Sequence, residues 1–173
     1  MSAHLHVCPL SRLAATARGC RAGHLVSILS PGADAAARPA DIPPQRHLRL
    51  TLSDIATPRD GLRLAGTADV VALLAFARTW DREKPMLIHC YAGVSRSTAA
   101  VLAVLCALQP HRPEADMAAA LRAASPTATP NPRLLALADE QLGRDGRLVA
   151  AAAAIGRGAD CFEGTPFCLP VEA

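Results

Sequence analysis

The pattern of apolar and polar positions divides the chain into a first half that favours strands and a second half that favours helices. Residues 4–10 and 24–30 are short apolar runs that predict strands, joined by an Ala- and Arg-containing segment compatible with a helix. Residues 46–54 place leucine at every second position between polar residues, which is the pattern of a half-buried strand. The first fifty-odd residues therefore predict three strands.

A fourth strand is predicted further along the chain. Residues 85–90, "PMLIHC", form a continuous apolar run, typical of a parallel strand buried on both faces. Residues 31–45 are rich in Pro, Ala and Asp and predict a surface loop, and "IATPRDGLRLAG" after Asp54 predicts a second one. The loops therefore alternate with the predicted strands.

Helical spacing begins after the second loop. Thr67 is a candidate N-cap with Asp69 in the first turn, and the apolar positions that follow, up to Trp80, fall on one helical face. The segment from Ser97 to Leu108 is apolar on all sides, which predicts a buried helix. Asn131 is a natural cap for a later helix. The further predicted helices are 113–124, 132–142 and 147–155, and residues 156–173 are expected to form an irregular tail.

Strands that alternate with helices and then give way to a run of helices predict an α/β fold. We expect a central, mostly parallel sheet of about four to five strands flanked by helices, with extra C-terminal helices. The length of 173 residues suits a single domain spanning 1–173. Aromatic residues make up 3% of the chain, so few large side chains are available to anchor the core. The candidates are Phe76, Trp80, Phe162 and Phe167.

Composition narrows the classes of function. The net charge is +3, but the basic residues are spread singly, which argues against a nucleic-acid-binding protein. No apolar run approaches the ~20 residues that cross a bilayer. The six cysteines and scattered histidines lack metal-ligand spacing, so we expect no metal and no cofactor. The excess of Ala and Arg suggests a bacterial source, and we expect a cytoplasmic protein with reduced thiols.

The segment from His89 to Thr98 concentrates the chemistry. If the bend after the apolar strand wraps around a ligand, it offers a row of backbone N–H groups, and Gly93 permits a conformation closed to other residues. The helix that follows adds its positive end, and such a nest binds a phosphate dianion without a metal. Arg96 can pair with two phosphoryl oxygens. Cys90, beside the same positive groups, ionises more readily than an ordinary thiol.

The sequence "HCYAGVSRS" resembles the His-Cys-x-x-Gly-x-x-Arg-Ser/Thr signature of the cysteine-dependent protein-tyrosine and dual-specificity phosphatases. The resemblance implies that Cys90 is the nucleophile that forms a phosphocysteine intermediate and that Arg96 binds phosphate. It implies that Ser97 stabilises the leaving thiolate and that His89 orients the loop and helps to keep the cysteine ionised. The implied phosphate-binding residues are Tyr91, Ala92, Gly93, Val94, Ser95 and Arg96.

The resemblance also implies a general acid, an Asp on a separate loop some thirty or more residues before the cysteine. Asp54 lies 36 positions before Cys90, at the end of a predicted strand, and Asp60 lies 30 positions before it in the same loop. We favour Asp54 because the strand holds it in place, and Asp60 remains the alternative.

These inferences predict a phosphomonoesterase of the protein-tyrosine or dual-specificity type. The expected substrate is protein phosphotyrosine, with phosphoserine and phosphothreonine as further candidates. Two alternatives stay open: a phosphate-recognition module without turnover, and a phosphatase of a small phosphorylated metabolite. The sequence does not indicate an oligomeric state.

Overall fold

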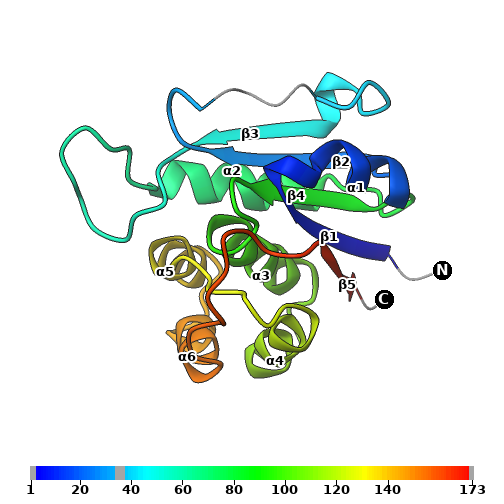
Figure 1. The fold of residues 1–173 in the computed structure, drawn as a ribbon. Helices are drawn as coiled ribbons and strands as arrows, with labels where there is room; N and C mark the ends of the chain where they lie inside the picture. Colours follow the sequence, from blue (N-terminus) through cyan, green and yellow to red (C-terminus); the bar gives the residue numbers. More distant parts are fainter. Residues whose placement is uncertain (1–2, 34–37, 172–173) are drawn as a thin grey trace.

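The computed structural model describes residues 3–33 and 38–171, and its centre is a five-stranded mixed sheet of order β3-β2-β4-β1-β5 (Figure 1). The first four strands along the chain run parallel to their neighbours, and β5 pairs antiparallel with β1 at the edge. The strands are β1 (Ala3–Pro9), β2 (His24–Leu29), β3 (His47–Thr51), β4 (Met86–Cys90) and β5 (Phe167–Val171). The predicted α/β fold with a mostly parallel sheet is therefore confirmed.

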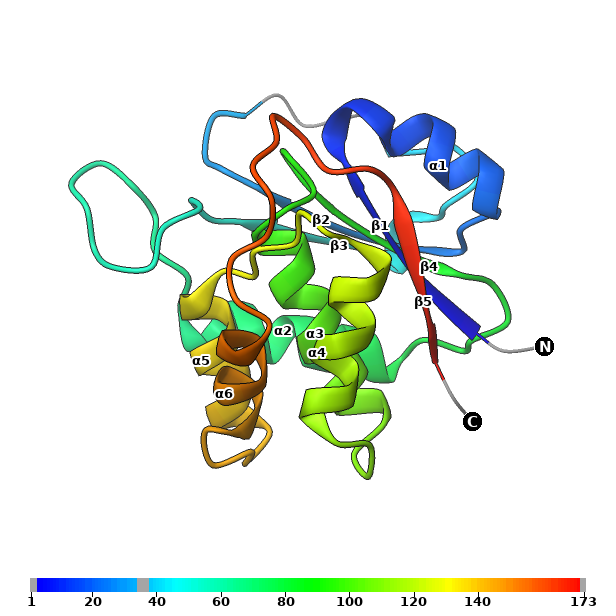
Figure 2. The ribbon, with the colours of Figure 1, turned by 60° about the horizontal axis from the view of Figure 1, so that its bottom comes forward.

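Helices cover both faces of the sheet. On one face, α1 packs its buried Leu13 and Ala17 against the strands, and the remaining helices form a thicker layer on the other face (Figure 2). The helix α3 is buried from Arg96 to Cys106, as its uniformly apolar sequence predicts, because α2, α4 and α5 surround it. The helices are α1 (Leu13–Cys20), α2 (Thr67–Arg78), α3 (Arg96–Leu108), α4 (Glu114–Ala124), α5 (Pro132–Gln141) and α6 (Arg147–Ala154).

The predicted loop at 31–45 ends in a short 3₁₀ turn at Pro44–Arg46, and residues 34–37 of the loop lie outside the described part.

The predicted start of α2 is wrong by one residue. Gly66, not Thr67, is the N-cap, and its N–H donates to the Asp69 carboxylate at 2.8 Å. Asp69 therefore stabilises the helix start, as its place in the first turn suggests.

Two expectations for the C-terminal segment are wrong. The predicted irregular tail contains β5, in which Leu169 and Val171 are buried whereas Cys168 and Pro170 are exposed. Pro170 is compatible with this strand, because an edge strand tolerates proline where no ladder hydrogen bond is needed. Phe162 is 87% exposed and does not anchor the core, whereas Trp80 is buried.

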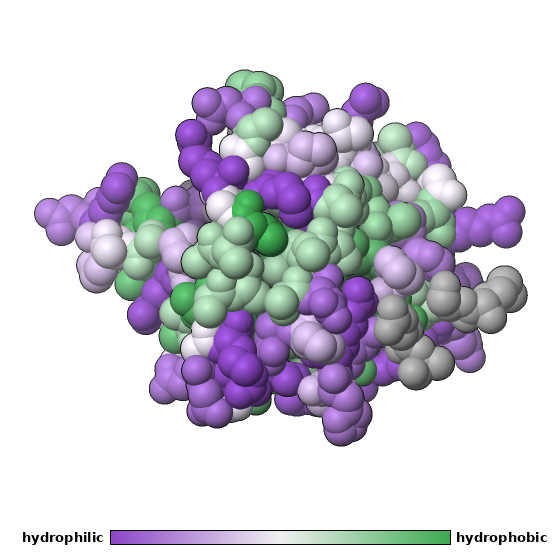
Figure 3. Space-filling model, turned by 90° about the horizontal axis from the view of Figure 1, so that it is seen from below, coloured by the Kyte–Doolittle hydropathy of each residue, from purple (hydrophilic) through white to green (hydrophobic). Residues whose placement is uncertain are grey.

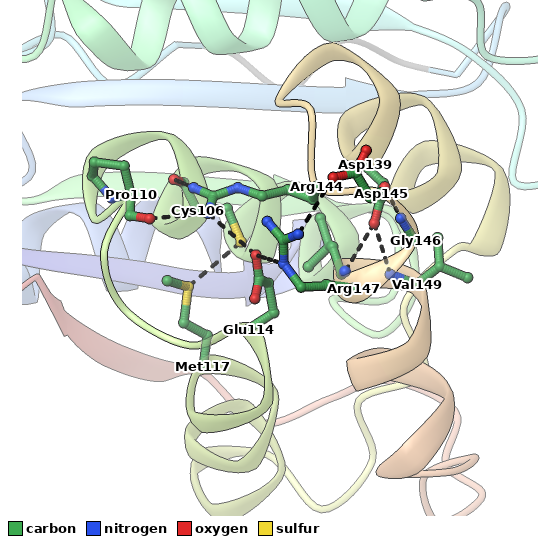
Figure 4. A network of polar contacts seen from close by, with 11 residues as sticks. Cys106, Pro110, Glu114, Met117, Asp139, Arg144, Asp145, Gly146, Arg147 and Val149 are labelled. Atoms are coloured by element: carbon green, nitrogen blue, oxygen red, sulfur yellow. Dashed lines mark hydrogen bonds and ion pairs between the residues drawn. The ribbon is translucent and has the colours of Figure 1, made fainter.

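A buried polar network joins the helices of the thicker layer (Figure 4). The Arg144 guanidinium donates to the Cys106 carbonyl at 2.8 Å and the Pro110 carbonyl at 3.0 Å, and it pairs with Glu114 at 3.2 Å. The Asp139 carboxylate accepts hydrogen bonds from the backbone amides that begin α6, those of Gly146, Leu148 and Val149. The network fixes the ends of α3, α4 and α5 to the start of α6.

The outer surface of this layer includes an apolar area among hydrophilic residues. Figure 3 views this side of the molecule and shows an apolar area bordered by hydrophilic residues. The exposed apolar residues of α6 are Val149, Ala150, Ala153 and Ala154. Among the described residues, no helix has the length and apolar character that a membrane span requires.

Candidate active site

The loop between β4 and α3 passes so close to β1 that only glycine fits at its centre. Gly93 has φ +69°, and a Cβ atom built there would lie 2.7 Å from the Pro9 nitrogen and 2.9 Å from the Cys8 carbonyl carbon. Both contacts are to backbone atoms, so a side chain at this position cannot be accommodated by a rotamer change. The predicted need for glycine at 93 therefore has two causes, the left-handed backbone and the contact with β1.

Four carbonyl groups of the loop point outward and are held by three separate segments of the chain. The pairs are Leu10 N to Tyr91 O at 3.0 Å, Gly164 N to Ala92 O at 2.8 Å, Thr129 N to Val94 O at 2.9 Å and Asn131 N to Ser95 O at 3.1 Å. Because C=O and the following N–H point in opposite directions across a trans peptide, these contacts turn the next amides inward. The inward amides are those of Ala92, Gly93, Ser95 and Arg96.

The Cys90 thiol lies at the base of this ring of amides and is 2% exposed. The Gly93 amide donates to its sulfur at 3.2 Å, and the Ser97 hydroxyl lies 3.1 Å from it. Both groups can donate to a thiolate. Burial raises the pKa of Cys8 to about 12 and that of Cys106 to about 11, so these two thiols stay protonated at neutral pH.

Arg96 is 5% exposed and is fixed through one nitrogen. Its Nη1 donates to the Ser30 hydroxyl at 3.0 Å and to the Leu52 carbonyl at 2.9 Å, beyond the ends of β2 and β3. Its buried Nε has no acceptor among the described residues. Through the edge formed by Nε and Nη2, an arginine can donate two parallel hydrogen bonds to two oxygens of a carboxylate or phosphate. The arrangement thus leaves a charged, oriented donor pair beside the loop.

Asp54 is exposed and contacts the loop directly. Its Oδ1 accepts hydrogen bonds from the Ser95 hydroxyl at 2.7 Å and from the Asn131 side-chain amide at 2.8 Å. Asp60 is also exposed, and no hydrogen bond joins it to the loop in the described part of the chain. The geometry therefore favours Asp54 over Asp60 for a role at the site.

Asn131 does more than the sequence indicates. Its Oδ1 accepts from Leu134 N at 3.0 Å, which confirms the predicted cap of α5. Its backbone amide also holds the loop carbonyl of Ser95, and its Nδ2 binds Asp54. No spacing signal could reveal these contacts, because Asn131 lies 77 residues from Asp54 along the chain.

His89 is fully buried directly before the cysteine, and its Nε2 lies 2.7 Å from the Ser27 hydroxyl. Burial lowers the pKa of His89 to about 4. The imidazole is therefore uncharged at neutral pH, and its influence on Cys90 comes from its position rather than from a positive charge.

Across the residues that the structure describes, no three His, Cys, Asp or Glu side chains group in a way that could hold a metal ion. The donors that surround Cys90 are instead amides, hydroxyl groups and a guanidinium, a set that suits an anion.

Comparison with known proteins agrees with this geometry. The family model described as "Protein-tyrosine phosphatase" matches residues 56–125, which include the loop and α3. No curated protein matches the chain.

Solved structures of phosphatases and of a phosphatase-like protein share the fold. The PTP-2 phosphatase of Cydia pomonella is 20% identical, with a TM-score of 0.61 over 79% of this chain and 84% of its own. Human DUSP28 is 21% identical, with a TM-score of 0.61 over 81% and 88%. The human tyrosine phosphatase-like serine/threonine/tyrosine-interacting protein is 18% identical, with a TM-score of 0.63 over 82% and 92%. The family model, the shared fold and the geometry of the loop therefore make this chain similar to the protein-tyrosine and dual-specificity phosphatases.

Proposed function

We propose that the chain hydrolyses protein phosphotyrosine through a phosphocysteine intermediate on Cys90, with phosphoserine and phosphothreonine as further substrates. The observation that carries this proposal is a buried thiol at the base of inward-pointing amides, with the open edge of Arg96 beside it. A phosphoryl group seated there places its phosphorus in line with the sulfur. Its three outer oxygens then meet the amides and the guanidinium.

In the first step, the Cys90 thiolate attacks phosphorus, so that the S–P bond forms and the bond to the leaving oxygen breaks. Protonated Asp54 donates its proton to that oxygen. The amides and Arg96 stabilise the charge on the equatorial oxygens, which is the main source of catalysis in phosphoryl transfer.

In the second step, water attacks the phosphocysteine, and the Asp54 carboxylate accepts a proton from it. The S–P bond breaks, and the Ser97 hydroxyl and the Gly93 amide stabilise the thiolate as it leaves. Ser95 and Asn131 hold Asp54 at the edge of the loop for both proton transfers.

The decisive experiment replaces the nucleophile. Cys90→Ser should abolish hydrolysis of p-nitrophenyl phosphate while binding of inorganic phosphate, measured by calorimetry, persists. Cys168→Ser, which changes an exposed cysteine of β5, is the matched control and should retain full activity. Substantial turnover by Cys90→Ser would contradict the mechanism.

The general acid is tested separately. Asp54→Asn should slow alkyl phosphates, which have poor leaving groups, more than aryl phosphates, because the acid matters most when the leaving oxygen is basic. Asp60→Asn is the control from the same loop. If the leaving-group dependence changes with Asp60→Asn instead, Asp60 is the acid.

A substrate panel tests the range of the site. Phosphotyrosine, phosphoserine and phosphothreonine peptides and small phosphorylated metabolites are compared by kcat/KM, with a phosphopeptide expected as the best substrate. A metabolite preferred over every peptide would assign the small-molecule alternative, and binding without turnover of any of them would assign the recognition module.

We further propose that residues 1–173 act as a single catalytic domain in a bacterial cytoplasm and bind no nucleic acid or membrane. The Ala- and Arg-rich composition and the scattered basic residues support this proposal. The cysteines, which are free, are consistent with a reducing compartment.

A further inference from the structure

Three polar side chains form a hydrogen-bonded chain across the face of the sheet that carries α1. Ser27 of β2 is paired with His89 of β4. On its other side, Ser27 is paired with Arg49 of β3, and His47 lies two residues before Arg49 on the same strand. The Ser27 hydroxyl is 2.7 Å from His89 Nε2 and 2.8 Å from His47 Nε2. The chain thus runs from the residue before the nucleophile to the half-buried start of the edge strand β3.

Both imidazoles are neutral at neutral pH. Burial is the main cause that lowers the pKa of each to about 4, and the nearby Arg49 acts in the same direction on both. Arg38 acts likewise on His47, and Arg96 on His89. A neutral imidazole carries one proton on one of its two nitrogens, and a hydroxyl has one proton to donate. The proton order along the chain therefore has two possible directions.

In one direction, His47 Nε2–H donates to Ser27 and the Ser27 hydroxyl donates to His89 Nε2, so that His89 carries its proton on Nδ1. In the other direction, His89 Nε2–H donates to Ser27 and Nδ1 is a bare acceptor. His89 Nδ1 is buried and has no hydrogen-bond partner of good geometry among the described residues. The adjoining Cys90 backbone favours the proton-bearing ring, since it raises the pKa of His89 against the effect of burial. The backbone of Cys90 therefore favours a proton on Nδ1, although Nδ1 forms no hydrogen bond within the described residues.

We propose that His47 is a positioning residue for the phosphatase reaction: by donating to Ser27, it holds His89 in the form protonated on Nδ1, and His89 in turn steadies the Cys90 backbone at the base of the loop. This inference rests on the proposed function of Cys90. It assigns a role to two residues, Ser27 and His47, that lie outside the loop and outside the signature. For a histidine that ligates a metal, loss of such an outer partner lowers activity about 10- to 100-fold, and we expect a loss on this scale here.

The direct test measures the proton position on His89 by the ¹⁵N chemical shifts of its two ring nitrogens. In the wild-type protein, Nδ1 should show the shift of a protonated nitrogen and Nε2 that of an acceptor. The reverse assignment would overturn the proposal without any variant. The measurement does not depend on turnover, so it stands even if the proposed phosphatase reaction fails in the Cys90→Ser test.

Variants then test the consequence. His47→Leu removes the terminal donor and should lower kcat about tenfold, shift the alkylation of Cys90 by iodoacetamide to higher pH, and mix the two His89 forms. His47→Gln keeps an N–H at similar reach and should restore all three properties. Alkylation is followed by mass spectrometry on the peptide that contains Cys90, because Cys161 and Cys168 are exposed.

His6→Leu is the matched control, since it changes a half-buried histidine of β1 that is not part of the chain. It should leave the alkylation profile and the His89 shifts unchanged. Equal losses in His47→Leu and His47→Gln would show a merely structural role and overturn the proposal, as would a wild-type alkylation profile in His47→Leu.

Discussion

The contact between the loop and β1 predicts a large effect of Gly93→Ala. A left-handed backbone costs an L-residue roughly 1–2 kcal/mol. The added Cβ would also lie 2.7 Å from the Pro9 nitrogen and 2.9 Å from the Cys8 carbonyl carbon. Overpacking against a rigid neighbour typically adds roughly 1–3 kcal/mol. The free energy of unfolding should therefore fall by about 2–5 kcal/mol.

The loss of activity should exceed what this instability alone would cause. The Cβ reaches an ordinary contact near 3.4 Å if the loop moves away from β1 by about 0.7 Å. A displacement of this order carries the inward amides away from the phosphoryl oxygens, and a misplacement near 1 Å can cost about 100-fold in rate. We expect kcat/KM for p-nitrophenyl phosphate to fall about 100-fold in a protein that is still folded at the assay temperature.

Gly143→Ala separates backbone strain from the clash. Gly143 has φ +61°, but nothing lies within 4 Å of its built Cβ, and it follows α5, away from the loop. Urea unfolding should show a loss of roughly 1–2 kcal/mol with wild-type kcat. The reasoning is refuted if Gly93→Ala unfolds no more easily than Gly143→Ala and keeps its activity within about threefold.

Three further predictions follow from the buried groups. Asn131→Ser keeps a capping oxygen but removes the amide that binds Asp54, so stability should change by less than about 1 kcal/mol while the leaving-group dependence of kcat steepens. His89 takes up a proton near 6.5 when unfolded but only near 4 when folded, so urea unfolding should show stability decreasing as pH falls through this range, by about 3 kcal/mol for this residue. Arg144→Ala leaves Glu114 buried without its main partner and should cost about 3–5 kcal/mol with kcat unchanged, whereas Arg144→Met with Glu114→Leu should recover most of that loss in the same unfolding assay.

Local sequence patterns predict the main helices and strands because the apolar pattern of each of these segments matches the structure that it forms. The parallel strands are buried by helices on both faces, and their apolar runs show this directly. The segment 167–171 has a weak strand pattern because it contains Pro170, and its pairing with β1 joins residues that are far apart in the sequence. Phe162 was misplaced because an aromatic residue indicates burial only on average. Here the segment that contains Phe162 contacts the loop through the backbone amide of Gly164, and the Phe162 side chain itself is exposed.

The residues of the site also fall into those that the sequence predicts and those that only the structure reveals. Cys90 and Arg96 are close in sequence, so their spacing alone predicts that they share one loop. Distance from Cys90 narrows the general acid to Asp54 or Asp60, and the contact of Asp54 with Ser95, which favours Asp54, could not be predicted from the sequence. Asn131 and Ser27 could not be predicted as site residues, because an amide or a hydroxyl gains such a role only from the distant group that it meets.

The signature loop depends on residues outside the signature. The sequence from His89 to Ser97 supplies the nucleophile, the cation and the glycine, but it does not by itself turn the amides inward. That direction depends on four carbonyl contacts supplied by segments after β1, before α5 and before β5. The Asn131 amide is one of these contacts, and its side chain also holds Asp54. A change that shifts Asn131 should therefore impair phosphate binding and proton transfer together, whereas a change at Leu10 or Gly164 should impair phosphate binding alone.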